Sequence, residues 1–349
     1  MVFDPPVSET VRTTPGSAQI KAQAFGLGFD LAGITTLGAP ETSAAFDTWL
    51  ASGFAGEMHY LERGADLRRD ARRPEPGMLS AIVVAMNYGG TQSSGPIARY
   101  ARGDDYHRVM HDKLDELGGW FTAQTRGAAR TRSYVDTGPI LERDLAQRAG
   151  LGWFGKNTNL INPAIGSFFF IGALFTDAEL EPDAPFEADR CGTCTRCLDA
   201  CPTQAFAAPR TLDATRCISY LTIELKGEIP LEFRAPIGEL VYGCDICQDV
   251  CPWNVRFSRD ATEPALMPRA DRVKADAAEL LALTDAEWRA RFGKSAMTRA
   301  KRRGLARNAA VALGNRRDPA TIPVLRAAER SDPDPLVRSH AAWALAQFE

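Results

Sequence analysis

All eight cysteines of the chain lie between residues 190 and 255, and their spacing limits the chemistry they can do. The first four form a C-x2-C-x2-C-x3-C-P run that begins at Cys191 and ends at Pro202. This is the bacterial ferredoxin spacing, in which the fourth thiolate is directed to a different cluster from the first three. The run therefore predicts two [4Fe–4S] clusters rather than one.

A second run, C-x2-C-x3-C-P, begins at Cys244 and has Val241 where its first cysteine would stand. Cys217 is the one cysteine outside the two runs, so it is available to complete the second set. With the crossed ligand of the ferredoxin pattern, we predict one cluster on Cys191, Cys194, Cys197 and Cys251, and the other on Cys201, Cys217, Cys244 and Cys247.

Two zinc sites are the alternative, because zinc also takes four thiolates with C-x2-C spacing. Zinc does not require the longer run with its crossed fourth ligand, so the spacing favours clusters. Disulfides are disfavoured because residues 1–17 contain no export signal, which indicates a reducing compartment. The C-x3-C-x2-C spacing of radical S-adenosylmethionine enzymes is absent from the sequence.

Three regions of different composition must position these cysteines. Residues 1–180 alternate strand patterns at 30–36, 79–86, 130–136 and 167–175 with helical patterns near 20–25, 110–121 and 139–150. We expect the strand at 79–86 to be buried on both faces. A proline-rich acidic bridge at 179–185 follows. We therefore predict a mixed α/β domain over 1–180, a cluster domain over 181–262 and a helical domain over 263–349.

The helical domain contains a weak internal repeat. Its Ala-Ala pairs at 309/310 and 341/342 are 32 residues apart, and a third helix and two proline turns lie between them. This helix–turn–helix order is typical of HEAT-like repeats. With fewer than three repeats, we expect these helices to pack on the rest of the protein.

The composition is that of an ordinary globular protein, with 349 residues, 45% hydrophobic and 24% charged. The longest apolar run, residues 168–175, is too short for a membrane helix. We expect a monomeric cytoplasmic protein with no membrane partner.

Residues 289–317, called the basic segment below, carry ten basic residues and no acidic one. The rest of the chain carries 31 basic and 44 acidic residues, so the positive charge is local. Such asymmetry is the footprint of a phosphate-binding face. A solvated helix face is the alternative, since 34 of the 41 basic residues of the chain are arginine.

Residues 150–155 match G-x-G-x-x-G, the dinucleotide-binding pattern. The expected context is a strand that enters a helix, whereas this match follows a predicted helix. We therefore expect no dinucleotide here.

Four stretches together identify a family: VDTGPILERDLAQRAGLGWFGKNTNLI at 135–161, CGTCTRCLDACPTQA, RCISYLTIE and YGCDICQDVCPWN. With the HEAT-like tail, they resemble the epoxyqueuosine reductases, cobalamin-dependent iron–sulfur enzymes that complete queuosine in transfer RNA anticodons. The resemblance implies an α+β fold: a nitroreductase- and reductive-dehalogenase-like cobalamin domain, a ferredoxin-like two-cluster domain and HEAT-like helices. It also implies reduction of epoxyqueuosine to queuosine by cob(I)alamin that is reduced through both clusters.

The resemblance implies that Asp136, in the VDTGP motif, is the proton donor. Considered without the family, an aspartate just before a helix is more commonly a helix cap. A helix that starts near Pro139 would lower the pKa of Asp136 through its dipole. Burial beside the corrin would therefore have to raise that pKa for Asp136 to act as an acid.

The family pattern also implies cobalamin contacts in three loops, although ordinary loop chemistry would use the same residue types. The positions are Tyr60, Arg99, Tyr100, Asp136, Lys156, Asn157 and Thr158. The D-x-H-x-x-G motif of histidine-bound cobalamin is incomplete, since Met110 replaces its glycine. We expect no axial histidine from the protein, and we place His59, His107, His111 and His340 at the surface or in the pocket.

For the basic segment, the resemblance favours tRNA phosphate contacts over a solvated face, at Arg299, Lys301, Arg302, Arg303 and Arg307. It also implies an external electron donor such as a flavodoxin or ferredoxin. Two other functions remain open on the sequence. One is a cobalamin-dependent reductive dehalogenase, and the other is a ferredoxin-type electron carrier with an RNA-binding tail.

Overall fold

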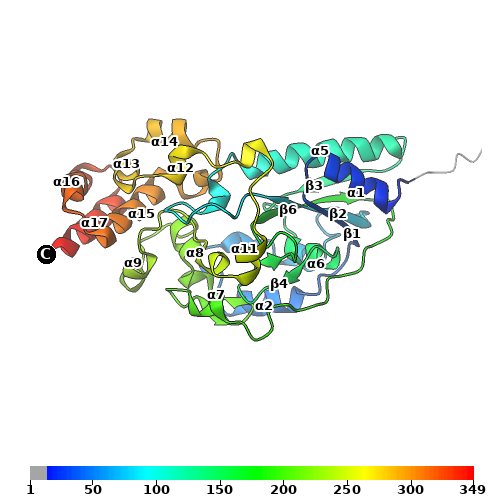
Figure 1. Ribbon diagram of the computed structural model, residues 1–349, viewed down its shortest axis with the longest axis horizontal. Coiled ribbons are helices and arrows are strands. Elements are labelled where there is room, and N and C mark those ends of the chain that lie inside the picture. Colours follow the sequence, from blue (N-terminus) through cyan, green and yellow to red (C-terminus); the bar gives the residue numbers. More distant parts are fainter. Residues whose placement is uncertain (1–13) are drawn as a thin grey trace, which may run out of the picture.

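A four-stranded antiparallel sheet forms the centre of the N-terminal region in the computed structural model, which describes residues 14–349 (Figure 1). Its strand order is β1 (Leu31–Thr36), β2 (Ser80–Asn87), β6 (Phe169–Thr176) and β3 (Thr131–Tyr134). All four strands were predicted from the sequence. The export-signal prediction rests on residues 1–17, of which 1–13 lie outside the described residues.

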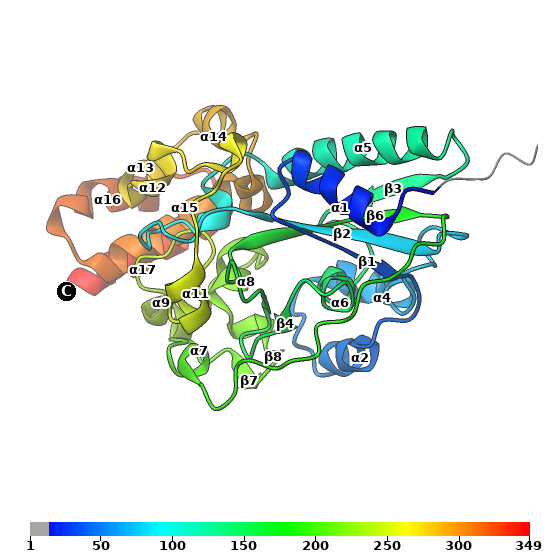
Figure 2. The same ribbon diagram turned by 45° about the vertical axis from the view of Figure 1, so that its right-hand side comes forward.

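Helices cover both faces of this sheet (Figure 2). On one face, Ile82 and Val84 of β2 share a core with Met110 of α5 (Tyr106–Gln124), and α1 (Ser17–Gly26) packs beside α5. On the other face, Ala81 and Val83 share a core with residues of α6 (Glu142–Arg148). Because successive side chains of a strand point to opposite faces, β2 is buried on both, as predicted.

Short elements complete this region: α2 (Ser43–Ala51), α3 (His59–Arg63), α4 (Ala65–Arg68), a 3₁₀ turn at Arg99–Ala101, and the hairpin of β4 (Trp153–Phe154) and β5 (Leu160–Ile161). The helix expected to open at Pro139 begins at Glu142 instead. Residues 135–141 therefore form a loop at the end of β3, and Asp136 is not the cap of α6. Gly150 follows α6, so the glycine pattern at 150–155 joins a helix to a strand, as expected.

The cysteine region is built of short elements around loops. They are α7 (Arg196–Asp199), β7 (Phe206–Ala208), β8 (Thr211–Leu212), α8 (Ile218–Ile223), α9 (Leu231–Ile237), α10 (Ile246–Asp249) and α11 (Pro252–Phe257). Each cysteine run continues into a one-turn helix, and these helices, α7 and α10, lie in contact. The two runs thus come together although about fifty residues separate them.

The C-terminal region is entirely helical: α12 (Ala270–Val273), α13 (Ala277–Ala282), α14 (Asp285–Phe292), α15 (Lys301–Arg316), α16 (Ile322–Ser331) and α17 (Pro335–Leu345). Helix α15 is its centre and contacts α13 and α17 on one side and α8 and α9 of the cysteine region on the other. The predicted packing of an incomplete repeat on the rest of the protein is confirmed. His340 of α17 is wholly buried, so its predicted surface or pocket position was wrong.

Among the residues that the structure describes, none of the helices has the length and apolar character needed to span a membrane.

Candidate functional site

The eight cysteines form two neighbouring sets. Burial, with smaller contributions from the nearby Cys251 and Cys191, raises the pKa of Cys197 to about 11. In the same way, burial raises the pKa of Cys244 to about 12, with contributions from Cys217 and Cys201. These neighbours support the two ligand sets, which stay a prediction, and Cys197 also raises the pKa of Cys247, so the two sets adjoin.

Within residues 14–349, no three His, Cys, Asp or Glu side chains converge closely enough to hold one metal ion. A cluster differs from a single ion because each of its four thiolates binds its own iron, so the sulfurs stay farther apart. Burial keeps the Cys197 and Cys244 thiols neutral until a metal core compensates the thiolate charge. The donor set therefore fits two iron–sulfur clusters.

Two side chains of the N-terminal region hold the cysteine loops. Lys156 Nζ donates to the carbonyls of Gly192 at 2.7 Å and Cys194 at 3.0 Å. Asn157 Nδ2 donates to the carbonyl of Cys247 at 3.3 Å. These residues were predicted as cobalamin contacts, and the structure gives their side chains partners in the cysteine region instead.

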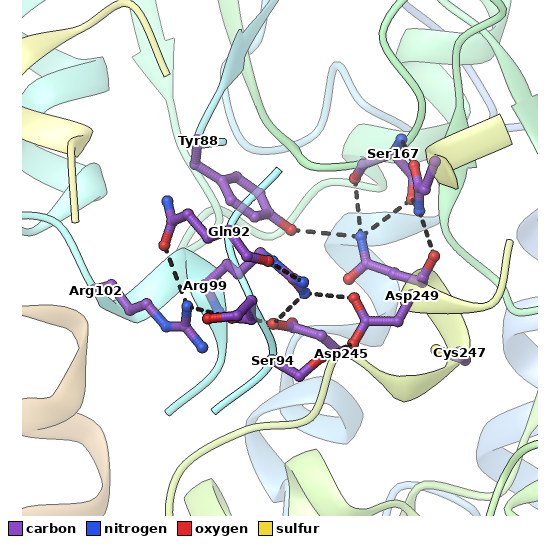
Figure 3. A network of polar contacts seen from close by, with 12 residues as sticks. Tyr88, Gln92, Ser94, Arg99, Arg102, Ser167, Asp245, Cys247 and Asp249 are labelled. Atoms are coloured by element: carbon purple, nitrogen blue, oxygen red, sulfur yellow. Dashed lines mark hydrogen bonds and ion pairs between the residues drawn. The ribbon is translucent and has the colours of Figure 1, made fainter. Parts of the chain in front are cut away.

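Arg99 joins the two regions in a buried network (Figure 3). Its guanidinium contacts Asp245 Oδ2 at 3.1 Å and Asp249 Oδ1 at 2.5 Å, and it also donates to the carbonyl of Gln92. Only 5% of Arg99 is exposed. Its prediction as a cobalamin contact is therefore wrong, because the side chain is buried and its charge is already paired with two carboxylates.

The same network reaches the wall of a cavity. Gln248 Nε2 donates to Ser167 Oγ at 3.0 Å and lies 3.5 Å from the Tyr88 hydroxyl. Tyr88 is close enough to Cys247 for that thiol to affect its pKa. The set that contains Cys247 is thus the set beside the cavity.

This cavity, of about 220 Å³, lies at the end of the central sheet. Tyr106 and Phe170 stack in its wall with ring centroids 4.0 Å apart and planes 4° apart. The lining residues are Tyr88, Tyr106, Asp136, Glu142, Arg143, Asn159, Leu160, Ser167, Phe169, Phe170 and Ile171. The site therefore combines an aromatic wall with two carboxyl groups.

Asp136 sits in a tight turn with φ 58°, closed by a 2.6 Å hydrogen bond from the Thr137 N–H to the Val135 carbonyl. Positive φ is uncommon outside glycine, although aspartate tolerates it. The Tyr106 hydroxyl donates to Asp136 Oδ2 at 2.6 Å, and His107 Nε2 lies 3.3 Å from the same oxygen. This turn directs the carboxylate toward the start of α5.

The protonation states of Asp136 and His107 differ from the expectation that burial raises the pKa of Asp136. Burial raises the pKa of Asp136, but the hydrogen bonds from His107 and Tyr106 outweigh it, and the net pKa is below the usual value. Burial lowers the pKa of His107, yet Asp105 and Asp136 raise it to about 9 overall. At neutral pH, Asp136 is therefore a carboxylate and His107 is protonated.

Both ring nitrogens of His107 face carboxylates, since Nδ1 lies 2.8 Å from Asp105 Oδ1. The pocket position predicted for His107 agrees with this geometry. His111 Nδ1 lies 3.1 Å from Ser133 Oγ, and His59 is an exposed neighbour of Glu62.

The remaining predicted cofactor contacts stand near the cavity but do not line it. Tyr100 lies behind Tyr106 with ring centroids 6.2 Å apart, and the carbonyl of Thr158 accepts from Arg143 at 2.5 Å. Of the residues that line the cavity, only Asp136 was predicted from the sequence. Glu142 and Asn159 lie in the same stretch at 135–161 as Asp136 and Lys156, and this nearness was the signal that could have found them.

The basic segment divides into buried and exposed residues. Arg302 pairs with Asp332 inside the helical domain, and 8% of its side chain is exposed. Arg307, 1% exposed, donates to the carbonyls of Leu221, Leu225 and Gly227 at 2.6 to 2.9 Å. The tRNA contacts predicted for Arg302 and Arg307 are therefore wrong, since neither guanidinium can reach a phosphate.

Arg299, Lys301 and Arg303 are exposed and can reach a ligand. Arg299 pairs with Glu224 at 2.8 Å and lies 5.2 Å over the ring of Tyr60. Glu224 raises the pKa of Arg299, with smaller contributions from Tyr60 and Asp136. Arg299, one of the exposed residues of the basic segment, therefore lies near the Asp136 site.

Three family models match the chain. Residues 68–137 match "Epoxyqueuosine reductase QueG, DUF1730", residues 190–254 match "4Fe-4S double cluster binding domain" and residues 294–349 match "HEAT repeats". The cluster match covers all eight cysteines and supports the iron–sulfur prediction over zinc.

Curated relatives match nearly the whole chain. It is 44% identical to the epoxyqueuosine reductase of Pseudomonas aeruginosa over 91% of both chains. It is 40% identical to the epoxyqueuosine reductase of Escherichia coli over 98% of this chain and 92% of the relative.

Solved structures agree. An epoxyqueuosine reductase crystallised with an epoxyqueuosine-modified tRNA-Tyr stem loop is 33% identical, with a TM-score of 0.87 over 95% of this chain and 89% of that one. The epoxyqueuosine reductase of Streptococcus thermophilus is 31% identical, with a TM-score of 0.86 over 95% and 90%.

Proposed function

Since the chain belongs to the epoxyqueuosine reductase family, we propose that it reduces epoxyqueuosine to queuosine in tRNA, with cobalamin and two [4Fe–4S] clusters. The alternative of an electron carrier is disfavoured because these relatives are enzymes over almost the same length. They also favour this reaction over the dehalogenase alternative.

One observation supports this function most: three different parts meet around Asp136. The aromatic cavity contains the carboxyl groups, the cysteine set with Cys247 lies behind the Tyr88 wall, and Arg299 stands at the rim. Redox centres, an acid site and a phosphate-binding rim are what a reductase of an RNA base requires.

The cavity wall suits one face of a large planar macrocycle. Phe169, Phe170 and Ile171 supply apolar surface, and Tyr88 and Tyr106 add polar edges. We propose that these residues, with Tyr100 as support behind Tyr106, hold the corrin, whereas Tyr60, Lys156, Asn157 and Thr158 stand around it. Bound cobalamin, in its reduced form, supplies the nucleophile and electron pair for epoxide opening.

Asp136 is the proposed proton donor, and His107 keeps it supplied. The His107 proton lies on the side of Asp136 Oδ2, while Asp105 Oδ1 holds the other ring nitrogen at 2.8 Å. As negative charge develops on the epoxide oxygen, the His107 proton moves to the Asp136 carboxylate, and Asp136 passes a proton on to that oxygen. Tyr106 orients the Asp136 carboxylate by its 2.6 Å hydrogen bond.

We propose that the tRNA backbone lies along Arg299, Lys301 and Arg303, because all three side chains are exposed and Arg299 is close enough to Asp136 for the carboxylate to affect its pKa. The modified base would then leave its stack to enter the site, as bases do in enzymes that act on them. Contacts to phosphates position the RNA and leave its sequence to be recognised elsewhere.

An external one-electron carrier, such as a flavodoxin or ferredoxin, is the proposed reductant. Arg190 and Arg196, which flank Cys191 and Cys194 in the sequence, are exposed. We propose that the donor docks there, and that the reaction takes place in the cytoplasm. The proposed domains remain 1–180, 181–262 and 263–349.

The experiment is the reduction of an epoxyqueuosine-modified stem loop by anaerobically reconstituted protein, compared with Asp136→Asn. The amide keeps the shape but not the acid, so turnover should fall by roughly 10²- to 10⁴-fold. Iron content and the corrin absorption spectrum should stay unchanged. A variant within about twofold of the parent would remove Asp136 from the proton-donor role, and no reduction by the parent protein would contradict the function.

A further inference from the structure

The proposed reaction consumes two protons, and Asp136 accounts for one. An epoxide that becomes an alkene takes up two electrons and two protons and releases one water. The first C–O bond breaks as its oxygen takes a proton, and the second breaks as the same oxygen takes another and leaves as water. The electrons come from the one-electron carrier through the clusters. A second acid is therefore useful at the site.

Glu142, the first residue of α6, is the other carboxyl group in the cavity wall. Part of its side chain is accessible from the cavity, whereas its Oε1 has no exposed surface and no hydrogen-bond partner among the described residues. A buried carboxylate oxygen without a partner is costly, but the neutral acid tolerates it far better. The geometry thus favours a protonated Glu142.

The charged and titratable groups around Glu142 come from four elements. Asp136 lies in the loop after β3, Tyr106 on α5, Arg68 on α4 and Arg143 on α6. Burial and the charge of Asp136 raise the pKa of Glu142 to about 8 overall, although a hydrogen bond from the Asp136 backbone and the charges of Arg143 and Arg68 lower it. The pKa values of the two cavity carboxyl groups therefore shift in opposite directions, so Asp136 is ionised and Glu142 is neutral at pH 7.

Two carboxyl groups with opposite protonation in one site usually have separate roles. We propose that Glu142 is a second proton donor, which gives its proton to the substrate oxygen when that oxygen leaves as water. This inference rests on the proposed function and adds a catalytic residue to it. Asp136 and His107 supply the first proton, and solvent restores Glu142 after product release.

The first test needs neither substrate nor cobalamin. Infrared difference spectra of the protein with its clusters, taken across pH 6 to 10, should contain a protonated-carboxyl band that titrates near pH 8. Glu142→Gln should remove that band, and Glu142→Asp should retain one at a shifted midpoint. Glu62→Gln, which changes an exposed glutamate of α3, should leave the band unchanged.

The second test is turnover of the modified stem loop. Glu142→Gln should lower kcat by about 10²-fold with KM little changed, because the amide keeps the shape and removes the proton. In the parent protein kcat should fall above pH 8 as Glu142 ionises. In the variant this fall should move toward pH 9, where His107 titrates. Glu142→Asp should recover part of kcat, and Glu62→Gln should match the parent.

The outcomes separate this inference from the proposed function. If the parent reduces the stem loop and Glu142→Gln matches it from pH 6 to 9, Asp136 serves twice and the inference is wrong. If no band is lost in Glu142→Gln, Glu142 is ionised at neutral pH and the inference is also wrong. A parent without reductase activity contradicts the function, while the infrared titration still reports the state of Glu142.

Discussion

The cysteine region was identified from its cysteines and the basic segment from its arginines and lysines, yet the two sets of side chains behave differently in the folded protein. The cysteine runs come together through contact of α7 with α10, and their nearest cysteine neighbours are compatible with the two predicted sets. Of the five predicted tRNA contacts, Arg302 and Arg307 are buried among carbonyls and a carboxylate. Spacing was a better guide to function than a count of charges.

The difference comes from how each side chain binds. Cysteine thiolates reach only a short distance, so a cluster needs them at fixed spacings that the sequence displays. Arginine has a long side chain and five N–H donors, so it can donate hydrogen bonds to the free carbonyls at a helix end as readily as to a phosphate. Arg307 does this where α8 ends, since its guanidinium satisfies carbonyls that the helix leaves free.

The strongest test of the cysteine region is a pair of double variants. Cys217→Ser should lower the iron content from about eight to about four per chain and abolish turnover, because a [4Fe–4S] cluster uses four cysteines. Adding Cys244→Ser should cost little further iron, since both residues belong to one set. Adding Cys251→Ser instead should remove the second cluster. The reverse pattern, measured by iron analysis, would refute the ligand sets.

Within the basic segment, Arg302→Met should have the largest effect on stability. The substitution leaves Asp332 buried without its partner, which should cost about 3–5 kcal/mol in the free energy of unfolding. Urea unfolding followed by circular dichroism measures this. The exposed neighbour variant Lys301→Met should change it by about 0.5 kcal/mol or less. Equal effects at both positions would mean that the buried ion pair is not structural.

His340 gives the helical domain an acid-sensitive contact. Its Nε2 accepts from the Ile229 N–H at 3.2 Å and its Nδ1 lies 2.7 Å from the Leu336 carbonyl. Burial lowers its pKa from 6.5 to about 4, so between these pH values the unfolded chain binds a proton at this histidine and the folded protein does not. This stability is complete above pH 6.5 and is lost as the pH falls toward 4, by an amount on the order of 3 kcal/mol.

The measurement is the melting temperature from pH 7.5 to 4.5. His340→Gln should have a shallower decrease than the parent, whereas the exposed variant His59→Gln should follow the parent. Parallel curves for His340→Gln and the parent would show that this histidine does not titrate with unfolding.

The smallest effect per residue is expected on tRNA binding. Replacing Arg299, Lys301 and Arg303 by Gln should weaken binding and lower its salt dependence by about 0.7–0.9 log units per log unit of salt for each phosphate that is no longer neutralised. Cognate tRNAs should all be affected alike, because phosphate contacts carry little sequence information. Filter binding under anaerobic conditions measures both quantities.

The matched control is Arg316→Gln with Arg317→Gln, at the other end of the 16-residue helix α15. These positions are about 24 Å along the helix from Lys301, so their replacement should leave the salt slope unchanged. If both variants lower the slope equally, the RNA follows the whole basic segment. If neither does, it docks elsewhere.

The sequence predicted the strands of the sheet because apolar runs and turn residues are local signals. It predicted β2 as buried on both faces, and the helices α5 and α6 on opposite sides explain that pattern. The start of α6 was predicted too early because Pro139 permits a first helical turn without requiring it. The structure places Asp136 in a positive-φ turn there, which no local pattern announced.

By itself, the sequence determined what depends on neighbours along the chain: the cysteine sets, the strand and helix order, and the motif that contains Asp136. The tertiary structure alone decided which charges are buried, because burial depends on elements distant in sequence. It paired Arg99 with Asp245, placed the Arg307 guanidinium on a carbonyl of α8, and put the carboxyl of Glu142 near that of Asp136. The free energy of a charge depends on its surroundings, so residue type alone could not assign these roles.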